Sequence, residues 1–62
     1  MNTKEIAAEL STIDYTIKTL DKLIVGAEYL LTPNEAVGEA IAFLKLSLIS
    51  LHERKLELRE LS

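Results

Sequence analysis

Hydrophobic residues in the first half of the chain recur at alternating intervals of four and three positions, from Ile6 to Leu31 without a miss. This spacing is typical of one face of an α-helix, whereas a β-strand would need alternation with a period of two. Asn2 followed by Glu5 is a candidate capping box at the helix start. We therefore predict a helix over residues 3–31. Its seam, the face expected to pack on a partner helix, consists of Ile6, Leu10, Ile13, Ile17, Leu20, Ile24, Ala27 and Leu31.

The one proline of the chain marks the boundary between its two halves, in the run Thr32-Pro33-Asn34-Glu35. Thr32 suits a helix N-cap, Pro33 suits the first helical position, and Glu35 completes a capping box. We therefore expect a turn at Thr32–Pro33 and a second helix over residues 33–60, so that residues 1–62 form a single helical-hairpin domain. The seam of this helix consists of Val37, Ile41, Leu44, Leu48, Leu51 and Leu58, with Lys55 filling one slot.

The later helix carries a second apolar stripe, which predicts self-association. The stripe lies roughly 100° or more around the helix from the seam. One partner helix cannot cover two faces, so we expect the stripe to contact another protomer. The expected fold is all-α, an antiparallel two-helix hairpin that self-associates into a helical bundle. The expected oligomer interface consists of Ala42, Phe43, Leu46, Ile49 and Leu56.

The composition also favours an oligomer, a dimer or higher, over a monomer. A chain of 62 residues, 48% of them hydrophobic, buries too little surface to be more than marginally stable alone. Disulfides are excluded because the chain has no cysteine, and a single histidine leaves no set of zinc ligands. We expect no metal and no other cofactor. Self-association is the stabilising device that remains.

The charge balance excludes some partners. The net charge is −3 and the isoelectric point is near 5.0, whereas duplex DNA binding draws most of its affinity from clustered Lys and Arg. Duplex DNA is therefore not an expected partner. No uncharged run approaches the roughly 18 residues that cross a bilayer, and Glu5 and Glu9 would interrupt a signal peptide. We expect a cytoplasmic protein without a membrane partner.

Catalytic patterns are missing from the sequence, so we expect no enzyme. Gly26 and Gly38 stand alone in helical segments and form no phosphate-binding loop. The serines have one potential base among them, His52, and no catalytic triad can be assembled. Gly26 would instead permit a bend in the first helix or the close approach of a neighbouring backbone.

Two tyrosines and a lysine on the first helix are candidate partner contacts. Tyr15 and Tyr29 lie on one stripe opposite the seam, with Lys22 close by. Three uses of this stripe stay open: packing against another protomer, binding another protein, or stacking on a nucleic-acid base while the lysine engages phosphate.

Three basic or titratable residues on the second helix, Lys45, His52 and Arg54, are candidate ligand contacts. Lys45 interrupts an otherwise uncharged stretch, so its ammonium group must reach water or meet an anion. Together with a tyrosine for stacking, these residues could hold a small phosphorylated ligand between protomers.

Two helices joined at Thr32–Pro33 give a layout that resembles Rop-type hairpins, a family that dimerises into an antiparallel four-helix bundle and organises RNA loop pairs. The resemblance spans the chain as architecture and carries over no RNA-binding residue. Residues 40–46 (Ala-Ile-Ala-Phe-Leu-Lys-Leu) are similar to part of the hairpin domain of phage cyclic-nucleotide sponges, which bury nucleotides between protomers. The acidic pair expected after that stretch is replaced here by Ser47 and Leu48.

These observations lead to three functional hypotheses. The first is a non-catalytic homo-oligomeric helical bundle that binds another protein, as a small inhibitor or regulator from a phage or mobile element does. The second is a sponge that sequesters a phosphorylated small molecule of the cyclic-nucleotide type, and the third is a Rop-like RNA-binding hairpin. Coiled-coil heptads, surplus apolar surface and the lack of catalytic patterns favour the first.

Overall fold

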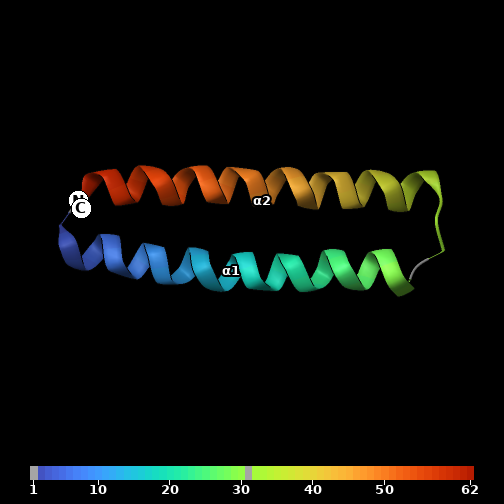
Figure 1. Cartoon of the computed structure of the whole chain (residues 1–62), viewed down its shortest axis with the longest axis horizontal. Helices are drawn as coiled ribbons and strands as arrows, with labels where there is room; N and C mark the ends of the chain where they lie inside the picture. Colours follow the sequence, from blue (N-terminus) through green and yellow to red (C-terminus); the bar gives the residue numbers. More distant parts are fainter. Residues whose placement is uncertain (1, 31) are drawn as a thin grey trace.

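The chain folds into two helices that pack against each other as an antiparallel hairpin (Figure 1). The computed structural model describes residues 2–30 and 32–62, with α1 spanning Thr3–Leu30 and α2 spanning Glu35–Leu61. Both ends of the chain lie at the same end of the hairpin, whose Cα atoms extend over 45 × 14 × 11 Å. The prediction of an all-α, two-helix fold is confirmed, and Leu31 of the predicted seam lies outside the described residues.

The capping box predicted at the start of α1 is present. Asn2 Oδ1 accepts a hydrogen bond from the Glu5 backbone N–H at 2.8 Å, and Asn2 Nδ2 donates to Glu5 Oε1 at 3.2 Å. The return bond therefore joins the two side chains, whereas the usual capping box returns to the backbone N–H of the cap residue. An acidic residue in the first turn also interacts favourably with the helix dipole.

The predicted start of α2 was wrong by two residues. The N-cap is Asn34 rather than Thr32: its backbone is extended, with φ −154° and ψ 174°, and its Oδ1 accepts from the Val37 backbone N–H at 2.9 Å. Pro33 therefore precedes the cap and does not occupy the first helical position. Asn is at least as good an N-cap as Thr, and the later start leaves three non-helical residues, 32–34, to reverse the chain.

The core lies between the two helices and is best covered toward the open end of the hairpin. Leu58 is fully buried, and it packs in a cluster with isoleucines of α1. Nearer the turn, the α2 seam residues are half-buried. The buried positions are Ile6, Ile13, Ile17, Ile24 and Leu58, and the half-buried seam positions are Leu10, Leu20, Ala27, Val37, Ile41, Leu44, Leu48 and Leu51.

Candidate binding surfaces

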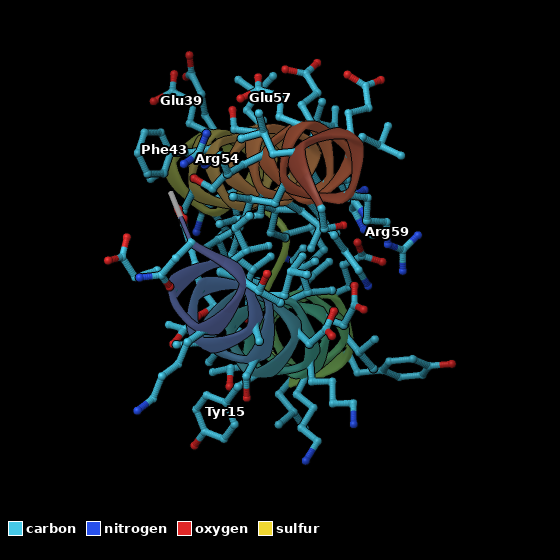
Figure 2. All side chains as sticks on the ribbon, turned by 90° about the vertical axis from the view of Figure 1, so that its left-hand side faces the viewer. Tyr15, Glu39, Phe43, Arg54, Glu57 and Arg59 are labelled. Carbon is cyan, nitrogen blue, oxygen red and sulfur yellow. The ribbon has the colours of Figure 1, made fainter. Side chains whose placement is uncertain are left out.

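One side of the hairpin, here called the charged flank, is joined by ion pairs between the helices. Lys45 Nζ lies 3.2 Å from Glu28 Oε1, and Lys55 pairs with Asp14. Seven-residue spacing places an acidic row on α1 and a basic row on α2, and Arg59 points to this side in Figure 2. The acidic row consists of Asp14, Asp21 and Glu28, and the basic row consists of Lys45, His52 and Arg59, with Lys55 of the seam beside it.

Asp14 shows the electrostatic effect of this pairing. The hydrogen bond from the Lys55 ammonium holds the pKa of the Asp14 carboxyl below its ordinary value of 3.8. The positive charges of Lys55, Arg59 and Lys18 act in the same direction. Asp14 is thereby held in its charged form, and the pair links the middle of α1 to the second half of α2.

The opposite side begins with an arginine clamp. Arg54 Nε and Nη2 donate to the two carboxylate oxygens of Glu9 at 3.0 and 3.2 Å, and Arg54 Nη1 donates to Glu57 Oε2 at 3.2 Å. These bonds raise the pKa of the Arg54 guanidinium above its ordinary value. Because Glu9 belongs to α1, the clamp identifies which rows of the two helices share this side.

From the clamp to the turn, this side carries uncharged residues on both helices at helical spacing, and we call it the uncharged flank. Phe43 and Arg54 point to this side in Figure 2, away from Arg59. Thr16 of α1 and Ser47 of α2 are already half-buried beside the core. The uncharged flank consists of Thr12, Thr16, Thr19, Leu23 and Leu30 of α1, and of Ala36, Ala40, Phe43, Ser47 and Ser50 of α2.

The threonines of the uncharged flank have satisfied hydroxyl donors. Each Oγ1 donates to the backbone carbonyl four residues earlier: Thr12 to Ala8 at 3.1 Å, Thr16 to Thr12 at 2.8 Å and Thr19 to Tyr15 at 3.0 Å. This back-bonding is a common way for a helix to absorb a hydroxyl group. A surface that covers the flank therefore need not supply acceptors for these threonines.

The outward face of α2 carries the apolar stripe expected from the sequence. Leu46, Ile49 and Leu56 are 63%, 54% and 59% exposed, so more than half of each residue's surface stays accessible to solvent in the hairpin. Phe43, 70% exposed, points over the uncharged flank instead of lying in this row (Figure 2). The α2 apolar row therefore consists of Ala42, Leu46, Ile49 and Leu56, and it is edged by Glu35, Glu39, Glu53, Glu57 and Glu60.

The outward face of α1 carries the tyrosine–lysine row, made of Tyr15, Lys18, Lys22 and Tyr29. Tyr15 and Tyr29 are 74% and 85% exposed, and Figure 2 shows Tyr15 pointing away from α2. Among the residues that the structure describes, Lys18 and Lys22 form no ion pair. This row takes no part in holding the hairpin together.

The residues considered for a phosphorylated ligand do not gather at one site. Lys45 is paired with Glu28 on the charged flank, whereas Arg54 is paired with Glu9 on the other side. His52 is exposed and makes no hydrogen bond or ion pair within the described part of the chain. A hollow of about 220 Å³ near the turn has Glu28 as its one charged lining residue. Lys45, His52 and Arg54 therefore do not form a phosphate site within a single hairpin.

Gly26 faces open space in the hairpin. A Cβ atom built there would meet no atom of another element within 4 Å, and the same holds for Gly38. Helix α1 continues through this position to Leu30. The close approach of a backbone, expected from the sequence, is therefore not made within one hairpin.

The described part of the chain holds neither a candidate metal site nor a candidate membrane span. Within residues 2–30 and 32–62, no group of three or more His, Asp or Glu side chains is arranged to hold a metal ion, and neither helix carries an apolar stretch long enough to cross a lipid bilayer.

Comparisons with models of protein families, with curated proteins and with solved structures gave no significant match. The surfaces of the hairpin are therefore the basis for any functional proposal.

Sequence reasoning missed the uncharged flank and the arginine clamp. The flank leaves a detectable signal, because Thr12, Thr16, Thr19, Leu23 and Leu30 follow helical spacing. A search for apolar residues alone passes over it, since threonine counts as polar. Pairing Arg54 with Glu9 depends on how the two helices are rotated about their axes, which the sequence does not state.

Proposed function

We propose that this chain is a non-catalytic homo-oligomeric helical bundle that acts by binding another protein. The observation that carries the proposal is the exposure of large apolar and aromatic side chains on both helices. Among the residues that the structure describes, five hydrophobic ones are buried, whereas ten large ones are more than half exposed. The exposed set consists of Tyr15, Leu23, Val25, Tyr29, Leu30, Phe43, Leu46, Ile49, Leu56 and Leu61.

The exposed area supports association. The hairpin exposes 4850 Å², whereas a compact monomer of 6.9 kDa exposes roughly 4,000 Å². The difference, roughly 850 Å², is close to the area of about 800 Å² that each partner buries in a standard protein–protein interface. Such surplus apolar surface on a small protein is typical of an interaction site.

The tyrosine–lysine row is the surface that we assign to the protein partner. Tyrosine is enriched at interfaces because its ring buries a large apolar area while its hydroxyl keeps a hydrogen-bonding partner. Tyr15 and Tyr29 are exposed and contribute nothing to the hairpin core. The row faces away from α2, so it stays accessible when other faces of the hairpin are covered.

Co-purification from the cells that naturally produce the protein tests this proposal with two matched variants. Tyr15→Ser/Tyr29→Ser removes the tyrosines, and Leu46→Ser/Ile49→Ser removes exposed apolar groups from the other outward face. We expect the wild type and the second variant to retain the same partner at a fixed stoichiometry, and the first variant to lose it. Equal retention by both variants, or no partner on the wild type, would contradict the proposal.

Native mass spectrometry of the same preparations reads the subunit count together with any bound ligand. We expect an oligomer without added mass. A small molecule retained by each oligomer would instead favour the hypothesis of a phosphorylated-ligand sponge, and a single-chain mass would remove the homo-oligomer.

A further inference from the structure

We infer that a second copy of this chain covers the uncharged flank, flank against flank, so that two hairpins close a four-helix bundle. The inference rests on the proposed function, because it names the face through which the chain self-associates. It differs from the expectation drawn from the sequence, which placed the oligomer interface on the α2 apolar row.

The uncharged flank is continuous with the hydrophobic core. The uncharged flank borders the seam on both helices, and Thr16 and Ser47 on it are half-buried. A copy placed there would also cover the half-buried seam residues near the turn, such as Leu20 and Leu44. The α2 apolar row, by contrast, lies on the outward face of one helix, and all four of its residues are exposed. Four helices around one core are a stable arrangement for helices of this length.

The distribution of charge also favours the uncharged flank as the interface. A copy on the uncharged flank brings together surfaces without like charges between the arginine clamp and the turn. Two copies joined symmetrically through the α2 apolar row would bring the glutamates at its edges together, which is unfavourable. A copy on the charged flank would have to desolvate the Lys45–Glu28 and Lys55–Asp14 pairs.

The sizes of the side chains on the uncharged flank suit close packing. Ala36, Ala40 and Ser47 of α2 are small, and the large Phe43 stands between Ala40 and Ser47 on the flank. Leu23 and Phe43 are 53% and 70% exposed in the hairpin. Large side chains that fit between small ones on a facing helix give the close packing of helical bundles. The same flank on two copies is self-complementary, as an isologous dimer requires.

The test compares two variants that add the same charge at similarly exposed apolar positions. Leu23→Lys/Phe43→Lys places two lysines on the uncharged flank, and Leu46→Lys/Ile49→Lys places two on the α2 apolar row. Because unpaired charges are strongly disfavoured in a buried interface, we expect the first variant to raise the dissociation constant at least about 100-fold and the second to change it less than about tenfold. Sedimentation equilibrium measures both, and circular dichroism reports whether each variant is helical.

The reverse pattern, with the dimer lost only in Leu46→Lys/Ile49→Lys, would overturn the inference in favour of the α2 apolar row. An unchanged oligomer in both variants would overturn it as well, while leaving the proposed self-association intact. A wild-type monomer would defeat the inference and the proposed homo-oligomer together, so the two failures are distinguishable.

Thiol labelling keeps the inference testable if the lysine variant does not fold without its partner copy. The chain has no cysteine, so Phe43→Cys and Leu46→Cys each introduce a single thiol, three residues apart on α2. Both positions are exposed in the single hairpin. In the folded oligomer we expect the thiol of Phe43→Cys to react at least about tenfold more slowly than that of Leu46→Cys, and both thiols to react alike in urea. Equal rates in the folded protein would overturn the inference.

Discussion

The two flanks of this hairpin are built from the same two helices but hold different kinds of side chain. On the charged flank, Asp14 and Glu28 of α1 face Lys55 and Lys45 of α2, and these pairs join the helices within one chain. On the uncharged flank, the ion pair of Arg54 with Glu9 joins the two helices at one end. The remaining residues of this flank are neutral. Exposed ion pairs add little stability but make a face unfavourable to cover. The difference favours contact of the charged flank with solvent and contact of the uncharged flank with a second chain.

The largest expected effect concerns the seam that both flanks share. Leu58→Ala opens a cavity at the most deeply buried side chain, and we expect it to lower the free energy of unfolding by about 2–5 kcal/mol. Urea titration followed by circular dichroism measures the change. Leu61→Ala, at a position 62% exposed, is the control and should change stability by less than about 0.5 kcal/mol. Equal effects of the two variants would show that the seam is wrongly placed.

A smaller effect is expected at Gly26, which lies beside the uncharged flank, seven residues after Thr19. Because a Cβ atom at Gly26 meets open space, Gly26→Ala should raise the free energy of unfolding by up to about 1 kcal/mol through helix propensity. Gly38→Ala, equally open, should act alike and serves as the control. If Gly26→Ala destabilised the protein while Gly38→Ala did not, a neighbouring chain would pack at Gly26, and the interface would extend beyond the uncharged flank.

The charged flank should show a pH dependence that Asp14→Asn reduces. A carboxyl whose pKa is lowered on folding stabilises the protein above its unfolded value of 3.8, and this contribution disappears as the pH falls through the lowered pKa. Thermal melts from about pH 7 to about pH 2 should therefore show the wild type above the variant at neutral pH and the two converging in acid. A constant difference across this range would contradict the role given to Lys55.

The smallest effect is expected for the pair of Lys45 with Glu28. Both side chains are about half exposed, 57% and 47%, so a double-mutant cycle to alanine should give a coupling of about 0.5 kcal/mol or less. Added salt should reduce it further. A coupling well above this value would mean that another chain covers the charged flank, which would reverse the comparison of the two flanks.

Local signals in the sequence were enough for the fold. The 4-3 spacing of apolar residues places both seams, because a helix must bury one face, and Asn2 with Glu5 fixes the start of α1. The start of α2 was misplaced because three candidates for its N-cap region, Thr32, Pro33 and Asn34, stand in a row. Which of them caps the helix depends on how many residues the chain needs to reverse its direction.

The surfaces were less predictable than the fold. The outward positions of Tyr15, Tyr29 and the α2 apolar row follow from helical spacing alone, and the structure places them on exposed faces. The partners of Lys45 and Arg54 do not follow from spacing, because they depend on the rotation and register of one helix against the other. The neutral row that contains the threonines of α1 was not predicted, because threonine counts as a polar residue. The hydroxyl groups of these threonines find their backbone acceptors only once the helix has formed.

The number of chains in the wild-type particle tests the central claim most directly. Sedimentation equilibrium at micromolar concentration should give twice the chain mass of 6.9 kDa, with the melting temperature rising as the protein concentration rises. A particle of 6.9 kDa at every concentration, helical and cooperatively folded, would contradict the account, because the uncharged flank would then be stable without a second copy.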